Sequence, residues 1–293
     1  MERSRMRAHA ALLLMVVIWA VNFSVAKVAL GELSPLAFNA LRFPLAAALL
    51  YLIMRSRGVI PLPTRAELPH VLALGLLGNL LYQMFFIFGL DRTRAGNASL
   101  LLAGTPIITA LLSAVLGHER VKPRVWLGVI ATFGGILLVV LGGRTQIETG
   151  RATLVGDLIM FGASIAWAFY TVGSRPLVDR YGALPVTAWT LWIGTAGLAA
   201  AGLGDVIRTS WQDVSALTWV AVVYAGVLSI GVAYIIWYYG VEKLGNTRTS
   251  AYSNLTPVIA LLVAWIWLGE VPTAPQVAGM AVILSGVSVA QSG

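Results

Sequence analysis

The sequence predicts an all-α membrane protein of ten transmembrane helices, arranged as two inverted five-helix repeats. Three observations lead to this fold class: an apolar composition, ten separate apolar runs, and an ordered set of residues that occurs twice. The 293 residues are 58% hydrophobic and only 11% charged, whereas soluble domains are about 45–50% apolar and about 25% charged. A chain with so few charges cannot cover a soluble surface, so we place it in a bilayer.

The apolar runs are long enough to cross a hydrocarbon core of roughly 30 Å, which takes about 20 helical residues. The expected helices cover residues 8–28, 36–54, 69–90, 95–116 and 124–142, then 154–173, 184–203, 216–239, 248–268 and 274–291. The first run follows three arginines, as a signal peptide would, but it lacks a small-residue cleavage site and continues to Lys27. We therefore interpret it as the first spanning helix.

An internal duplication divides these helices into two groups of five. The duplicated set is a Thr-Pro pair, a glutamate and two glycines, and the second copy lies 151 residues after the first at every position. The two copies are Thr105-Pro106, Glu119, Gly128 and Gly135, and Thr256-Pro257, Glu270, Gly279 and Gly286. The sequence thus predicts a first repeat over residues 8–143, a linker over 144–153 and a second repeat over 154–291.

The basic residues set the expected orientation. With a cytoplasmic N-terminus, 13 of the 20 Lys and Arg residues lie in cytoplasmic segments and 5 in outer loops, which leaves Lys27 and Arg42 inside helices. This bias predicts that both termini are cytoplasmic. Because five is an odd number, the second copy must then enter the membrane upside down, which is a transporter architecture.

With these features the sequence resembles the EamA family of the drug/metabolite transporter superfamily. The resemblance covers essentially the whole chain and rests on the two five-helix halves, each ending in a Thr-Pro helix, a Gly/Glu turn and a glycine-spaced helix. It implies export of small metabolites, amino acids or drugs by alternating access. The tryptophan content of the chain, 10 residues, suggests the aromatic amino-acid exporter subgroup.

The duplicated residues have structural interpretations as well as functional ones. A proline inside a helix removes one hydrogen bond, so Pro106 and Pro257 are expected to kink the helices at 95–116 and 248–268, either as static kinks or as hinges of transport. Each glutamate is expected to cap the N-terminus of the helix that follows it or to pair with a neighbouring base such as Arg120 or Arg124. The glycines lie on one face of the helices at 124–142 and 274–291, which predicts a close packing seam, either internal or a dimer contact.

Four helices place aromatic, amide and hydroxyl side chains along one face at helical spacing. These candidate substrate-binding residues are Trp19, Asn22 and Phe23 in the first helix, Asn79, Tyr82 and Phe86 in the third, Trp167 and Tyr170 in the sixth, and Tyr234 and Trp237 in the eighth. Polar groups are costly against lipid. The pattern is typical of a cavity that holds a flat or amphiphilic molecule, with ordinary bundle packing as the alternative.

Arg42 completes the candidate site, since an ionisable residue deep in a spanning helix is a functional hypothesis by default. It is expected to meet either a substrate carboxylate or a helix carbonyl. Lys27 lies near a helix end and is expected to reach the interface. Carboxylates are scarce in the expected helices, which disfavours the exchange of cations for protons and favours neutral or zwitterionic substrates.

The sequence therefore predicts an exporter of small metabolites in the inner (plasma) membrane, with aromatic or apolar amino acids as the first expected substrates. The alternatives in the same fold are efflux of cationic drugs and exchange of sugar phosphates or nucleotide sugars. An intramembrane enzyme is not expected, because the three histidines fall at helix ends and form no catalytic constellation. We expect no metal, no cofactor and no nucleic-acid partner. The expected partners are a small-molecule substrate, the lipid bilayer and, through the helices at 124–142 and 274–291, a second copy.

Overall fold

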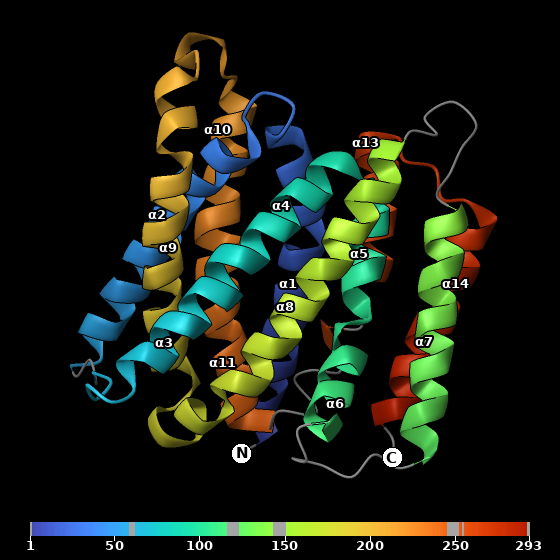
Figure 1. Ribbon diagram of the computed structural model, residues 1–293, viewed down its shortest axis with the longest axis horizontal. Helices are drawn as coiled ribbons and strands as arrows, with labels where there is room; N and C mark the ends of the chain where they lie inside the picture. The colour runs from blue at the N-terminus through green and yellow to red at the C-terminus, as the bar shows by residue number, and fades with distance from the viewer. Residues whose placement is uncertain are drawn as a thin grey trace.

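The computed structural model describes residues 2–58, 62–115, 123–142, 151–244, 252–253 and 255–291. Within these ranges the chain is helical, without β-strands. The helices run side by side as a bundle, with α7 and α14 as a pair at one edge, and the beginning of α1 lies at the same end of the bundle as the last turn of α14 (Figure 1). Six helical segments are long and apolar enough to cross a membrane, and three apolar helices are shorter. The expected class, an all-helical multi-pass membrane protein, is confirmed.

The helices follow the apolar runs closely, although several runs are subdivided. The first half contains α1 (Glu2–Ala29), α2 (Pro35–Ser56), α3 (Leu68–Gly75), η1 (Leu76–Leu81), α4 (Tyr82–Arg92), α5 (Ala95–Ala103), α6 (Thr105–Val115) and α7 (Pro123–Gly142). The second half contains α8 (Arg151–Tyr181), α9 (Ala183–Arg208), η2 (Trp211–Asp213), α10 (Ala216–Val223), η3 (Tyr224–Val232), α11 (Ala233–Leu244), α13 (Thr256–Leu268) and α14 (Ala274–Gln291). The helix expected over 154–173 extends to Tyr181, because hydropathy marks the membrane crossing and the backbone stays helical beyond it.

Two of the expected helices contain π-helical segments in their middle. The segment η1 separates α3 from α4, and η3 separates α10 from α11, at corresponding places in the two halves. π-Helical turns are rare in proteins, and those that occur are often found at functional sites. Both contain glycines in close contact with other helices: a Cβ on Gly78 would collide with the ring of Tyr170, and one on Gly226 with the carbonyl oxygen of Arg42. These two segments therefore bring backbone close to two of the candidate site residues.

The two Thr-Pro pairs lie at helix starts, which corrects the expectation of kinks inside continuous helices. The run at 95–116 is broken at Gly104, and Pro106 is the second residue of α6. Pro257 is likewise in the first turn of α13. Proline is well tolerated there, because the first-turn N–H groups have no helical partner to lose. The hinge role of Pro106 and Pro257 stays a prediction.

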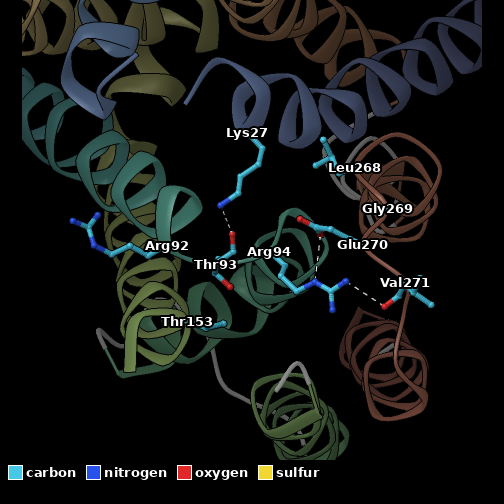
Figure 2. A pocket seen from close by; sticks show the side chains of 9 residues that line it. All are labelled: Lys27, Arg92, Thr93, Arg94, Thr153, Leu268, Gly269, Glu270 and Val271. Atoms are coloured by element: carbon cyan, nitrogen blue, oxygen red, sulfur yellow. Dashed lines mark hydrogen bonds and ion pairs between the residues drawn. The ribbon is translucent and has the colours of Figure 1, made fainter. Parts of the chain in front are cut away.

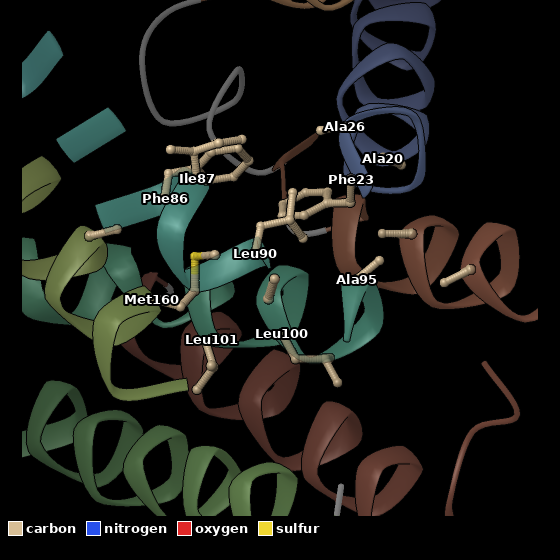
Figure 3. Packing of buried hydrophobic residues seen from close by; sticks show 14 of the residues in the cluster. Ala20, Phe23, Ala26, Phe86, Ile87, Leu90, Ala95, Leu100, Leu101 and Met160 are labelled. Carbon is tan, nitrogen blue, oxygen red and sulfur yellow. The ribbon is translucent and has the colours of Figure 1, made fainter. Parts of the chain in front are cut away.

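A hydrophobic core joins the first half of the chain to the second. Its largest cluster contains Phe23 of α1, Ile87 and Leu90 of α4, and Met160 of α8, all buried. Figure 3 shows the side chains of α1, α4, α5 and α8 meeting in this cluster. Each of these helices contributes apolar side chains to the cluster, and the polar site described below lies next to the cluster.

The contacts between the halves are reciprocal. In the first half α1 packs against α11 and α13, while its counterpart α8 packs against α4 and α6; α2 packs against η3, and α9 against η1. Two polar contacts at the helix ends follow the same rule. The backbone N–H of Ser215 donates to Glu32 over 2.8 Å, and Arg180 pairs with Glu67 over 2.9 Å. Arg180 lies 148 residues after Glu32, and Ser215 lies 148 residues after Glu67, so the two contacts join equivalent positions of the two halves. Hydrogen bonds from Thr64 lower the pKa of Glu67 to about 2.

The glycines of the duplicated set form a seam between α7 and α14. A Cβ on Gly135 would lie 2.8 Å from the carbonyl oxygen of Gly279, and one on Gly286 would lie 2.8 Å from that of Gly128. Small residues allow two helix backbones to approach this closely. The glycine face is thus occupied inside one chain. A dimer through these helices would have to use their other faces, and it stays a prediction.

We expect Gly135→Ala to destabilise the protein and Gly134→Ala to serve as its matched control. The added methyl at position 135 would meet backbone atoms of α14, whereas nothing lies within 4 Å of one at position 134. Overpacking costs about 1–3 kcal/mol, while alanine in a helix is otherwise favoured over glycine by about 1 kcal/mol. Thermal unfolding in detergent should show a lower Tm for Gly135→Ala only. Equal Tm values for the two variants would contradict the seam.

Candidate functional site

Arg42 lies in the first half of α2 and is the largest fully buried side chain among the described residues, with 1% of its surface exposed. Its Nε donates to Oδ1 of Asn39, and its Nη2 donates to Oε1 of Gln83, both over 2.9 Å. The amide of Asn39 also donates to the backbone carbonyl of Gln83 over 3.3 Å. In the described part of the chain no carboxylate pairs with this guanidinium, and Nη1 has no hydrogen-bond partner. The charge is therefore held by two neutral amides.

Aromatic rings surround the same guanidinium. Its central carbon lies 4.7 Å from the ring centroid of Phe38, 5.4 Å from that of Phe43 and 5.7 Å from that of Phe86. Ring faces attract cations. Phe43 also belongs to a buried cluster against which Tyr234 of the second half packs. Arg42 thus lies among aromatic rings of the first half, one of which shares a cluster with a tyrosine of the second.

The first group of candidate residues forms a continuous aromatic cluster. The ring centroid of Trp167 lies 4.8 Å from that of Tyr82 and 5.2 Å from that of Tyr170. Tyr82 in turn lies 6.2 Å from Phe86, which lies 5.8 Å from Phe23. The hydroxyl of Tyr170 shares a hydrogen bond of 3.1 Å with Thr190 on α9. The structure thereby joins candidates from α1, α4 and α8.

A second cluster contains the remaining aromatic candidates. The ring centroid of Trp19 lies 5.7 Å from that of Trp237 and 6.5 Å from that of Tyr234, the latter edge-on. The indole N–H of Trp19 donates to the carbonyl of Ser229 in η3 over 2.9 Å. Trp19 and Trp167 are 148 residues apart and occupy equivalent positions in the two halves. They therefore lie in different clusters, and each packs against a helix of the other half. The ring of Phe86, in the first cluster, lies 5.7 Å from the central carbon of the Arg42 guanidinium.

The two candidate asparagines each have a buried atom without a partner. Oδ1 of Asn22 and Nδ2 of Asn79 are inaccessible and make no hydrogen bond of good geometry to any described residue, although the Asn79 side chain lies near the hydroxyl of Tyr170. A buried polar atom of this kind normally has a protein or water partner. Asn79 lies in η1, four residues before Gln83. These amides provide one acceptor and one donor that a bound molecule or water can satisfy.

A pocket of about 580 Å³ lies at the end of the bundle opposite the chain termini. It is lined by Lys27, Arg92, Thr93, Arg94, Thr153 and residues 268–271. Figure 2 shows that Lys27 reaches toward Thr93, whereas Arg92 points away from the other charged groups. The amine of Lys27 donates to the carbonyls of Leu90, Asp91 and Thr93 over 2.8–2.9 Å, at the end of α4. Lys27 thus caps a helix C-terminus, where a cation is favoured, rather than extending along the lipid.

Glu270 connects the two halves at this pocket. Its carboxylate accepts from the backbone N–H groups of Ala95 and Gly96 over 3.0 and 3.1 Å, and it lies 3.9 Å from Nε of Arg94. The expected capping role is therefore found, but the helix is α5 of the first half and not the one that follows Glu270. The corresponding Glu119 lies outside the described residues.

Sequence reasoning missed Asn39 and Gln83, the two amides that hold Arg42. Both are strongly polar residues within apolar runs, which is the signal that could have found them. Asn39 precedes Arg42 by three residues, a spacing that places the two side chains next to each other on a helix. Gln83 follows the π-helical segment η1, where a uniform spacing of 3.6 residues no longer tells which residues share a face. Lys27 stands out in the sequence as a base within an expected helix, but its partners cannot be seen there because they lie 63–66 residues away along the chain.

The model of the EamA-like transporter family matches the chain twice, over residues 6–141 and 154–290. The chain belongs to the EamA-like transporter family. This agrees with the resemblance seen in the Thr-Pro, Glu and Gly positions. In this family member, the buried Arg42 and the two aromatic clusters lie within the apolar, membrane-spanning part of the bundle.

Several relatives of this transporter match it over almost their whole length. An uncharacterized transporter of Bacillus subtilis (strain 168), YyaM, is 28% identical over 92% of this chain and 88% of its own. A protein of Streptantibioticus cattleyicolor named a probable terminal-alkyne amino-acid exporter is 30% identical over 94% of this chain and 91% of its own. A crystal structure with 22% identity superposes with a TM-score of 0.68 and covers 97% of this chain and 96% of that one. This likeness shows a shared fold.

If the clusters line the transport path, the double substitution of Trp19→Ala with Trp167→Ala should weaken substrate binding. Aromatic contacts contribute about 0.5–1.5 kcal/mol each, so we expect about a tenfold increase in the half-saturation concentration for an aromatic substrate. Uptake of labelled tryptophan into proteoliposomes measures this. Trp126→Ala is the control, because Trp126 lies on α7 with 52% of its surface exposed. Unchanged uptake in the double variant would remove both tryptophans from the site.

Proposed function

We propose that this protein exports small metabolites across the inner (plasma) membrane by alternating access, and that aromatic or apolar amino acids are its first substrates to test. The observation that carries this proposal is the site around Arg42, where a buried positive charge lies beside three phenylalanine rings and next to aromatic clusters that join the two halves of the chain. Such a site suits a substrate with an apolar side chain and a small charged group. The relative named as an amino-acid exporter supports the same substrate class.

The mechanism that we propose uses two inverted five-helix repeats. The reciprocal contacts between the halves support it, because elements of two copies related by a twofold axis contact each other in corresponding pairs. The bonds of Glu270 to α5 also support a state that is closed at the pocket end. Phe23 and Phe86 lie one helical turn before Lys27 and Leu90 on α1 and α4, and their ring centroids are 5.8 Å apart. Opening at the pocket end would separate Glu270 from the start of α5, where it now joins the two halves.

The other substrate classes fit the site less well. A permanent cation would be repelled by Arg42, and the described site contains no carboxylate to attract it. Sugar phosphates or nucleotide sugars carry more negative charge, and they would require several basic groups to converge. Of the bases in the pocket, Lys27 is bonded to carbonyls and Arg94 lies beside Glu270. Family and relatives are transporters, which argues against an enzyme.

A flux assay in proteoliposomes tests the proposed function with four compounds: tryptophan, threonine, a quaternary ammonium dye and a sugar phosphate. We expect tryptophan to cross the membrane down its gradient, while the dye and the sugar phosphate are not transported. An imposed pH gradient should change the rate little, because the described site has no carboxylate to carry a proton. Transport of the dye alone, and only against a proton gradient, would show that the amino-acid proposal is wrong.

Cysteine labelling tests the proposed orientation, and it needs no background substitution because the chain contains no cysteine. Ser56 is the last residue of α2 and Ser210 follows the end of α9; both are exposed, and these two helix ends lie at opposite ends of the bundle (Figure 1). With both termini in the cytoplasm, a membrane-impermeant maleimide should label Ser210→Cys in intact cells. It should label Ser56→Cys only after the membrane is permeabilised. The reverse pattern would mean that the termini face outward.

A further inference from the structure

The charge balance at Arg42 is incomplete. Its hydrogen-bond partners, Asn39 and Gln83, are neutral, and so are the rings around it. Taking a charged group out of water costs several kcal/mol even after relaxation. Amide oxygens and ring faces offset part of this cost, but they supply no opposite charge. Within the described part of the chain the site is therefore complementary to an anion.

The arrangement also favours one kind of anion. A guanidinium presents its N–H groups in a planar fork that matches the two oxygens of a carboxylate. Asn39 and Gln83 occupy Nε and Nη2, which fixes the orientation of the fork. Nη1 has no partner among the described residues, and Phe38, Phe43 and Phe86 provide apolar surface next to the charge. A single carboxylate attached to an apolar body fits these surroundings better than a phosphate with two charges.

We propose that Arg42 binds the carboxylate of the transported molecule, and that Asn39 and Gln83 are positioning residues that hold its guanidinium. The protein then recognises an amino acid by its acid group and its side chain, and compounds that lack the acid are poor ligands. This inference rests on the proposed transport function and makes it more specific. It also gives a role to a buried arginine that has no acidic partner among the residues that the structure describes.

Three probes with the same ring separate the contributions of the acid and amino groups. They are phenylalanine, 3-phenylpropionate, which lacks the ammonium group, and phenethylamine, which lacks the carboxylate. Isothermal titration calorimetry on the purified full-length protein in detergent measures their binding without any need for transport. We expect phenylalanine and 3-phenylpropionate to bind, and phenethylamine to bind at least tenfold more weakly, because charge-assisted hydrogen bonds are among the stronger ones.

Two substitutions of Arg42 test its charge and its shape. Arg42→Gln should weaken the two carboxylate probes by about tenfold to a hundredfold and leave phenethylamine unchanged. Arg42→Lys keeps the charge but loses the fork, so its affinity should be intermediate. Arg208→Gln is the matched control, because it removes an exposed arginine from the last turn of α9 and should not change binding.

Gln83→Glu provides a test that does not depend on removing Arg42. Glutamate has the same size as glutamine, and its carboxylate would replace an amide oxygen that now lies 2.9 Å from Nη2. The charge would then be neutralised inside the protein. We expect an unchanged or higher Tm together with loss of carboxylate binding. A merely structural Arg42 would tolerate this change and leave binding as it was.

The outcomes separate this inference from the proposed function. Equal affinity for phenylalanine and phenethylamine, unchanged binding in folded Gln83→Glu, or no binding of any probe to the wild-type protein would each overturn the role of Arg42. The export proposal would survive them if tryptophan still moved in the flux assay. Arg42-dependent binding without any flux would support the carboxylate site and contradict export.

Discussion

A single charge in a medium that cannot solvate it is the constraint on which the centre of this structure depends. In a bilayer, polar groups must be satisfied inside the protein, and Arg42 is almost completely buried. The amides of Asn39 and Gln83 hold it, and aromatic rings cover the rest. Because these partners come from α2 and α4, the charge requires the two helices to converge at one place. The site thus forms because the guanidinium of Arg42 needs hydrogen-bond partners, and the described partners leave its charge unbalanced.

The periphery obeys the same rule at the helix ends. A helix that ends within the bundle leaves carbonyl or N–H groups unpaired, and charged side chains from elsewhere in the chain satisfy them here. Lys27 bonds the last carbonyls of α4, and Glu270 bonds the first N–H groups of α5. The bonds of Glu270 join the second half of the chain to α5 of the first, whereas those of Lys27 join α1 to the end of α4 within the first half. Capping the helix ends therefore also holds neighbouring helices together at this end of the bundle.

Close backbone approach is the second structural device, and it explains why the glycines occur where they do. The seam between α7 and α14 has no room for a methyl group at Gly135 or Gly286. The π-helical segments η1 and η3 use glycine in the same way near Tyr170 and Arg42. In a medium where burial of apolar surface drives helix association weakly, such contacts and a few hydrogen bonds replace the hydrophobic effect. The aromatic clusters can then form between helices of opposite halves.

Composition, apolar run length and the Thr-Pro, Glu and Gly spacing by themselves determined the all-helical membrane class and the family, because these are local or periodic properties of the chain. The aromatic faces of α1, α4 and α8 could also be traced, since helical spacing determines which residues share a face. Only the tertiary structure decided that Trp19 and Trp167 lie in separate clusters, that the prolines begin helices, and that Glu270 caps α5. It alone brought Gln83 to Arg42, 41 residues away. Such partners depend on the three-dimensional approach of distant segments and on π-helical turns that interrupt the regular period, and neither leaves a local pattern.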